Sequence, residues 1–331
     1  MPELPPQVIP PAQSRCLPWH QETWINLQAQ CANGRLPHAM LLEGTPGTGR
    51  NRLALSLARY LLCGDMSAQG NCGSCKTCTL SASGAHPDLL TVMPAETGKA
   101  IGIDAIREVI RFAAGTPTLG RSKVMLISPA ESLTQAAFNA FLKCLEEPSS
   151  ETFIVMVSAS GYPLPATIRS RCQRWKLPSP SLKESRAWLQ EALSGDADGA
   201  ASIDAMLELS GGRPLYALEK LHSDESGGLI NLHSATRASL REGRPLPGLE
   251  QAVAKVQPDN ALDVLESNLH SWLRAQRGDR LRSREARRGF AALETIAQLR
   301  AAKRSGTNPN VDLLQFKAVS VINGLWDEET R

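Results

Sequence analysis

The sequence lacks any apolar run that approaches the ~20 residues needed to cross a bilayer. Its first residues, MPELPPQVIPPAQ, are rich in proline and lack a basic start followed by an apolar stretch, so they do not resemble a secretory signal. We therefore expect a cytoplasmic protein with no membrane partner. Because thiols stay reduced in the cytoplasm, the eight cysteines are interpreted first as metal ligands or core residues rather than as disulfides.

The chain also lacks a strong net charge. Lys and Arg number 36 against 33 Asp and Glu, a formal net charge of +3, so any contact with nucleic acid would come from local patches or from partners. Between Arg274 and Arg304 there are ten basic and three acidic residues. This bias is compatible with a DNA-facing surface, but a solvated helix face or pairing with other subunits is the preferred interpretation.

Short apolar runs with helical patterns between them predict an α/β domain built on a parallel sheet. The runs expected to form buried strands are residues 39–43, 89–93, 124–127 and 153–157. The clearest helix is expected at about 132–147, where one continuous apolar face is stopped by Pro148.

The length of 331 residues suggests two or three domains. LPSPS at 177–181 is typical of a linker, and only helical patterns follow it. A polar stretch at 222–228 predicts a further boundary. We therefore predict three domains, at residues 1–178, 179–222 and 223–331.

The stretch GTPGTGRN, residues 44–51, has almost the spacing of a phosphate-binding loop, G-x-x-x-x-G-K-[ST]. An apolar run precedes it and a helical pattern follows, the context in which backbone N–H groups hold phosphates. Arg50 replaces the lysine, and Asn51 replaces the hydroxyl residue that holds Mg²⁺. The candidate nucleotide-binding residues are Gly44, Gly47, Gly49, Arg50 and Asn51. A glycine-rich turn that merely joins strand to helix is the alternative, and binding of ATP, of ADP or of neither stays open.

The strand at 124–127 also lacks the acids of an ATPase. In a P-loop ATPase an aspartate at the end of this strand helps to hold Mg²⁺, whereas here Ser128 takes that position and Pro129 follows. Proline can neither bind a metal nor transfer a proton. Glu131 comes too late along the chain, and we interpret it as a favourable charge in the first turn of a helix. We therefore predict that the chain does not hydrolyse ATP.

Four of the cysteines have the spacing of metal ligands. Cys63 follows the helix after the loop, and NCGSCKTC supplies Cys72, Cys75 and Cys78. Four thiolates fit a closed tetrahedral Zn²⁺ site, whose role would be structural because no position stays open. Bacterial ferredoxins also begin C-x₂-C-x₂-C but continue x₃-C-P, and the corresponding residue here is Ala82. An iron–sulfur cluster and free thiols are the alternatives to zinc.

In combination these pieces resemble the delta-prime subunits of bacterial DNA polymerase III clamp loaders, which are AAA+ proteins. The match runs in order over about residues 35–175 and is weaker beyond. Its segments are RLPHAMLLEGTPGTGR (35–50), the cysteine module (63–78), HPD (86–88), NAFLKCLEEP (139–148), TIRSRCQ (167–173) and NPNVDLL (308–314). The strand-ending acids missing here are intact in the family's motor subunit, gamma/tau, which favours delta-prime.

The resemblance implies an architecture and a role. Residues 1–178 would form an AAA+ P-loop domain with the zinc module at 63–78 inserted, residues 179–222 a helical lid, and residues 223–331 an all-α collar. The role would be that of a noncatalytic stator in a ring with delta and three gamma/tau motor copies. That ring opens the sliding clamp and places it on primed DNA during replication.

The resemblance also implies a site. Ser170, Arg171 and Cys172 match the family's SRC motif, whose arginine acts in trans on the ATP held by a neighbouring motor subunit. Without the resemblance, a buried or surface ion pair would be the simpler interpretation of Arg171. Two other functions are alternatives: an active gamma/tau-type ATPase, which the missing acids argue against, and a zinc-dependent nucleic-acid-binding module, around whose cysteines only Lys76 is basic.

Overall fold

The computed structural model divides into two compact units, Met1–Pro180 and Ser181–Arg331. The residues that it describes are 14–96, 98–147, 149, 151–193, 199–245, 247–304, 317 and 319–326. Pro148 and the matched segment at 308–314 lie outside the described residues. The three predicted domains stay a prediction, because the division into two units does not separate a lid from a collar.

The first unit is built on a five-stranded parallel sheet with the order β2-β3-β4-β1-β5. The strands are β1 Ala39–Gly44, β2 Leu89–Val92, β3 Lys123–Ile127, β4 Thr152–Ala159 and β5 Gln173–Lys176. The four predicted strands and the α/β class are confirmed. β5 was not predicted, because it is a short edge strand with three of its four residues exposed and therefore carries no apolar run.

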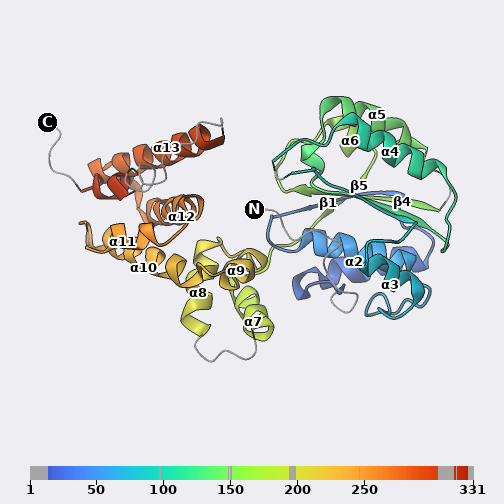
Figure 1. Ribbon diagram of the computed structural model, residues 1–331, viewed down its shortest axis with the longest axis horizontal. Coiled ribbons are helices and arrows are strands. Elements are labelled where there is room, and N and C mark those ends of the chain that lie inside the picture. The colour runs from blue at the N-terminus through green and yellow to red at the C-terminus, as the bar shows by residue number, and fades with distance from the viewer. Residues whose placement is uncertain are drawn as a thin grey trace. The chain divides into compact units, whose positions relative to one another are not determined.

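Helices cover both faces of this sheet, which gives the unit three layers (Figure 1). On one face lie α2 Arg50–Leu62 and α3 Lys76–Ala82; on the other lie α4 Ile103–Ala114, α5 Gln135–Glu146 and α6 Ala166–Arg169. Successive side chains of a strand point to opposite faces. Met40 and Leu42 of β1 therefore belong to one buried cluster with α2 and with α1 Gln21–Ala32, whereas Leu41 belongs to a second cluster with α4 and α5.

Because all five strands run the same way, the sheet has an amino edge, where strands begin, and a carboxyl edge, where they end. The candidate phosphate loop follows β1 and so lies at the carboxyl edge. At the other end of α2, Cys63 lines a cavity with Ser122, which directly precedes β3, and with Thr152, the first residue of β4. Helix α2 thus joins the phosphate loop at one edge to the cysteine module at the other.

The helix predicted at 132–147 is α5, which begins three residues later than expected, at Gln135. Thr134 sets this start, because its Oγ1 accepts the N–H of Ala137 at 3.2 Å and caps the first turn. The residues before the cap form a separate 3-10 helix, Ala130–Ser132. A second 3-10 helix, Pro18–His20, precedes α1.

In its described residues the second unit contains helices and no strand, as predicted. The helices are α7 Leu182–Ala192, α8 Gly199–Leu209, α9 Pro214–Leu221, α10 Ser226–Glu242, α11 Leu249–Ala254, α12 Pro258–Ala275, the 3-10 helix Gly278–Arg282 and α13 Arg284–Arg304. One buried apolar cluster extends from Leu189 to Leu325 and includes residues of α8, α10 and α12. Among the helices described in either unit, none is long and apolar enough to cross a membrane.

Part of the basic stretch 274–304 is engaged in contacts within this unit. Arg300 forms an ion pair with Glu266 of α12 at 2.6 Å. Arg288 donates a hydrogen bond to the carbonyl oxygen of Leu325 at 3.1 Å. For these two arginines the contacts favour a structural role over a DNA-facing surface.

Candidate functional site

The candidate phosphate loop joins β1 to α2 in the predicted order of strand, loop and helix. Gly47 and Gly49 have φ values of 79° and 92°, a left-handed conformation that residues with a side chain rarely adopt. The Oγ1 atom of Thr48 donates to the carbonyl oxygen of Thr45 at 2.7 Å, and the indole N–H of Trp19 donates to the carbonyl oxygen of Thr48 at 2.8 Å. These bonds hold the loop within the chain, and the assignment of the loop residues to nucleotide binding stays a prediction.

Two residues at the positions where the sequence analysis predicts that Mg²⁺ ligands are missing contact each other directly. The Oγ atom of Ser128 donates a hydrogen bond to Oδ1 of Asn51 at 2.7 Å, which links the end of β3 to the first turn of α2. In a working P-loop ATPase the residues at these two positions help to hold the metal ion. Ser128 is only 3% exposed, so water competes little for this bond.

Glu131 also reaches the loop, a contact that the sequence analysis missed. Its Oε1 atom lies 3.8 Å from Nη1 of Arg50 and accepts the N–H of Ala159 at 3.1 Å. Both side chains are largely buried, at 9% and 13% exposure, which strengthens their attraction relative to a surface pair. The contact had no signal in the sequence, because it depends on the 3-10 helix Ala130–Ser132 that follows β3.

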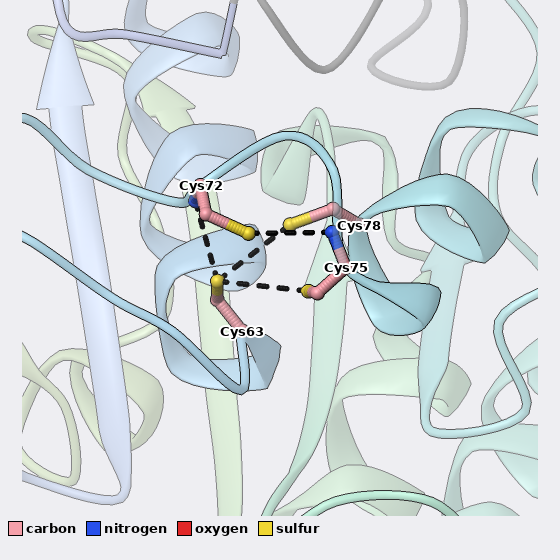
Figure 2. Close-up of side chains that lie close together, drawn as sticks. All are labelled: Cys63, Cys72, Cys75 and Cys78. Atoms are coloured by element: carbon pink, nitrogen blue, oxygen red, sulfur yellow. Dashed lines mark hydrogen bonds between the residues drawn. The ribbon is translucent and has the colours of Figure 1, made fainter.

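The four predicted metal ligands lie together (Figure 2). The Sγ atoms of Cys63, Cys72, Cys75 and Cys78 are all within 4.8 Å of one another. Sγ of Cys63 is 3.8 Å from that of Cys75 and 3.7 Å from that of Cys78, far longer than the ~2.05 Å of a disulfide. Four sulfurs at ~2.3 Å from a tetrahedral zinc ion would lie about 3.8 Å from one another. The cluster therefore has the size and the donor set of a tetrahedral metal site.

Hydrogen bonds to sulfur hold the cluster together. The backbone N–H of Cys72 donates to Sγ of Cys63, and that of Cys75 donates to Sγ of Cys72, each at 3.3 Å. The side-chain amide of Asn71 donates to Sγ of Cys78 at 3.2 Å. Donors of this kind orient metal ligands and stabilise the thiolate form that binds a metal.

The thiols of the cluster differ in acidity. Burial raises the pKa of Cys63 to about 12. Burial also acts to raise the pKa of Cys75, but hydrogen bonds from the Thr77 hydroxyl and from the backbone N–H groups of Cys78 and Gly64 outweigh it and lower that pKa to about 6. Cys75 is thus the more readily deprotonated of these two ligands.

A buried arginine lies beside the cluster. Arg59 is 1% exposed, and its Nε donates to Oγ of Ser81 in α3 at 3.0 Å. Burial lowers the pKa of Arg59, while the negative charge of Cys78 raises it. A cation at this place offsets part of the negative charge that four thiolates would carry, and it joins α2 to the helix that bears Cys78.

The HPD segment (86–88) stabilises the amino edge. Asp88 is fully buried, and its carboxylate oxygens accept the N–H groups of Thr118 at 2.7 Å and Leu119 at 2.8 Å. Burial acts to raise the pKa of Asp88, but these N–H donors and that of Gly120 hold it below its ordinary value. The carboxylate therefore fixes the turn that leads into β3.

The SRC residues lie between α6 and β5. Ser170 Oγ donates to the carbonyl oxygen of Thr167 at 3.1 Å, and Cys172 is buried, which raises its pKa to about 12. Arg171 between them is 32% exposed, and its Nε donates to Oε1 of Glu146 at 2.6 Å. The ion pair that was the alternative interpretation is thus present, and the action of Arg171 in trans stays a prediction.

Arg171 and the phosphate loop belong to opposite edges of the sheet. Gln173, the first residue of β5, pairs with Met40, which is four residues before Gly44. At ~3.3 Å per residue, the loop begins about 13 Å beyond the start of β5 along the strand direction. Arg171 precedes β5 and pairs with Glu146 at the end of α5, so both residues lie at the amino edge, opposite the loop of their own chain.

Comparisons with known proteins bear on the family to which the chain belongs. Residues 19–181 match the family model described as DNA polymerase III, delta subunit. The chain is 40% identical over 205 residues to DNA polymerase III subunit delta' of Pseudomonas aeruginosa, a match that covers 62% of this chain and 61% of that protein. The chain thus spans about three fifths of the length of that relative.

A second relative is matched over more of its length. The chain is 32% identical over 277 residues to DNA polymerase III subunit delta' of Yersinia pestis, which covers 83% of this chain and 78% of that protein. A solved DNA polymerase III gamma subunit-related protein from Thermotoga maritima has a similar fold, with a TM-score of 0.50, 18% identity, and coverage of 91% of this chain and 99% of that one. At this identity the likeness supports the fold alone. The extent and identity of the Yersinia match show that this chain belongs to the DNA polymerase III subunit delta' family.

Proposed function

We propose that this chain is a noncatalytic stator subunit of a cytoplasmic DNA polymerase III clamp loader. Its partners would be delta and gamma/tau, and through them the sliding clamp and primed DNA. In this proposal Arg171 acts in trans on the ATP of a neighbouring gamma/tau subunit. The observation that carries the proposal is the placement of a partly exposed Arg171 at the amino edge of the sheet, opposite the loop of its own chain.

The chemistry of that role follows from charge. Hydrolysis of ATP spreads negative charge over the transferring phosphoryl group, and a positioned arginine stabilises it. In GTPases an arginine supplied in this way contributes roughly 10³–10⁵ in rate. A subunit that supplies the arginine from outside makes hydrolysis depend on assembly of the ring.

The carboxyl edge supports the noncatalytic part of the proposal. Ser128 and Asn51 bond to each other where an ATPase would place two Mg²⁺ ligands. The acid that does lie close by, Glu131, is engaged with Arg50 and with the backbone of Ala159. We infer that the loop does not hydrolyse ATP.

We further propose that the cysteine cluster holds one structural Zn²⁺. The four Sγ atoms fit its tetrahedral geometry. When bound, the ion would supply a cross-link between the end of α2, at Cys63, and the segment 72–78. With four thiolates no position would stay open for a substrate, so the ion would stabilise the module and take no part in hydrolysis.

The test is DNA-stimulated ATP hydrolysis by a loader reconstituted from delta, gamma/tau and this chain, with wild type compared with Arg171→Ala. We expect turnover at the site that receives Arg171 to fall by roughly 10³-fold, with assembly unchanged in gel filtration. Arg169→Ala is the matched control, because Arg169 is an exposed arginine two residues away at the end of α6. An assembled Arg171→Ala loader with wild-type turnover would refute the trans role, and ATP turnover by the pure chain at a motor's rate would refute the noncatalytic role.

A further inference from the structure

The guanidinium of Arg171 is held at two sides by its own chain. Its Nε donates to Oε1 of Glu146 at 2.6 Å, and its Nη2 donates to the same oxygen. Its Nη1 donates to the carbonyl oxygen of Thr167, one turn earlier, at 3.0 Å. The side chain is thereby restricted to one orientation although a third of it is exposed.

These bonds leave part of the guanidinium available. An arginine has five N–H donors, two of them on each Nη atom. Within the described residues the contacts of Arg171 use three of the five: one on Nε, one on Nη1 and one on Nη2. One donor on each Nη atom therefore remains, and N–H donors of an arginine form charge-assisted hydrogen bonds with the oxygens of a phosphate group.

Both partners of Arg171 lie on parts of the fold that are themselves fixed. Glu146 is the last residue of α5, directly after the buried Leu145. The carbonyl oxygen of Leu145 lies 2.9 Å from Nε2 of His38, which anchors the end of this helix beside the start of β1. On the other side, buried Cys172 ties the backbone of Arg171 to the core.

We propose that Glu146 is a positioning residue for Arg171. It holds the guanidinium, with the Thr167 carbonyl, so that two N–H donors stay available for the phosphoryl oxygens of a nucleotide on a neighbouring subunit. An exposed ion pair adds little to the stability of a fold, whereas a long arginine side chain that is already ordered loses less conformational freedom when it meets its ligand. This inference rests on the proposed function of Arg171.

A positioning role and a charge role predict opposite results for two variants. Glu146→Gln keeps a carbonyl oxygen at the place of Oε1 and removes the charge. Glu146→Asp keeps the charge and withdraws the oxygens by one methylene. If position matters, Glu146→Gln retains turnover within about twofold and Glu146→Asp loses roughly tenfold, a smaller loss than removal of the arginine itself.

The experiment measures kcat and KM for DNA-stimulated ATP hydrolysis in the reconstituted loader. We expect Glu146→Asp to lower kcat and to leave KM for ATP unchanged, because ATP is bound by the neighbouring subunit and Arg171 acts on its phosphoryl group. In the Arg171→Ala background, Glu146→Asp should have no further effect, since its target is gone. Glu147→Ala is the matched control, because Glu147 is the adjacent exposed carboxylate.

The outcomes separate this inference from the proposed function. Wild-type turnover of Arg171→Ala in an assembled loader would overturn both. A loss with Arg171→Ala together with unchanged or faster turnover for Glu146→Asp would overturn only the positioning role of Glu146. If Glu146→Asp lowers turnover as much in the Arg171→Ala background as in the wild type, the positioning role is also overturned, because the carboxylate then acts independently of the arginine.

Discussion

The two edges of the parallel sheet differ in where their polar groups are directed. At the carboxyl edge, side chains that follow β3 contact the first residues of α2: Ser128 donates a hydrogen bond to Asn51, and Glu131 lies 3.8 Å from Arg50. At the amino edge, Arg171 is held by Glu146, and its contacts with the described part of the chain leave two N–H donors. One edge is closed by internal contacts, and the other presents a charged group outward.

In the proposed function, this difference separates a subunit that supplies an arginine from a subunit that hydrolyses ATP. In open α/β sheets, ligands bind at the carboxyl ends of the strands, and the loop at 44–51 lies at such a place. In the proposed function, the hydrogen bond between Ser128 and Asn51 preserves the fold at this place without hydrolysis of ATP. The amino edge holds Arg171, whose partly exposed side chain supports the proposed role on another subunit.

Loss of the cysteine cluster should have the largest effect on stability. The contacts that are lost should all lie at the amino edge. For Cys75→Ser we expect less than one bound zinc per chain and a fall in unfolding free energy of more than about 3 kcal/mol, the upper end of the usual range for point mutations, because structural zinc contributes directly to folding. Metal analysis together with thermal unfolding measures both quantities.

Cys16→Ser is the control for this change, since Cys16 lies outside the cluster and contacts Gln21. Its zinc content and stability should equal those of the wild type. Iron in the purified protein with visible absorption would contradict zinc, and a fully stable Cys75→Ser variant would contradict a structural role for the cluster.

The buried carboxylate of Asp88 gives a second test of the difference between the two edges, because its contacts lie at the amino edge. Asp88→Asn replaces one of the two acceptor oxygens by an N–H₂ group, which then faces the N–H group of Thr118 or that of Leu119. We expect a loss of about 2 kcal/mol at pH 7, measured by urea unfolding. Asp104→Asn, in an exposed pair with Arg107, should lose no more than about 0.5 kcal/mol.

The Asp88 effect has a defined pH dependence. Its pKa is lower in the folded chain than its ordinary value of about 3.9, so the stabilisation by the carboxylate is present above that value and is lost as the pH falls through the folded pKa. The difference between wild type and Asp88→Asn should stay constant from about pH 7 to pH 5 and narrow below about pH 4. A constant difference down to pH 2 would contradict this account.

The smallest effect is expected at the carboxyl edge, where Ser128 bonds to Asn51. Ser128→Ala should lower the free energy of unfolding by about 1 kcal/mol, the usual net contribution of such a bond. In a double-mutant cycle with Asn51→Ala, the double variant should lose less unfolding free energy than the sum of the two single losses, because each single variant breaks the same contact. Fully additive losses would show that the bond contributes nothing to stability. ATP turnover in any of the three variants would contradict the proposal that the carboxyl edge does not hydrolyse ATP.

Much of the fold was predictable because it depends on local pattern. Four strands carried apolar runs, the helix at 132–147 carried a continuous apolar face, and the four cysteines carried metal-ligand spacing. β5 was missed because an edge strand with exposed side chains has no such run. The N-cap at Thr134 shortened the predicted helix, since a hydroxyl that accepts a backbone N–H fixes the first turn more strongly than periodicity does.

The sequence by itself determined the α/β order, the ligand set of the cysteine cluster and the absence of the strand-ending acids, because each is a matter of residue type and spacing. The tertiary structure alone decided which groups meet. Ser128 bonds to Asn51 77 residues away, and Arg171 bonds to Glu146 25 residues away. Such pairs depend on strand register and on where helices end, and neither can be inferred from the residues next to each partner in the sequence. The same register places Arg171 and the phosphate loop at opposite edges of one sheet.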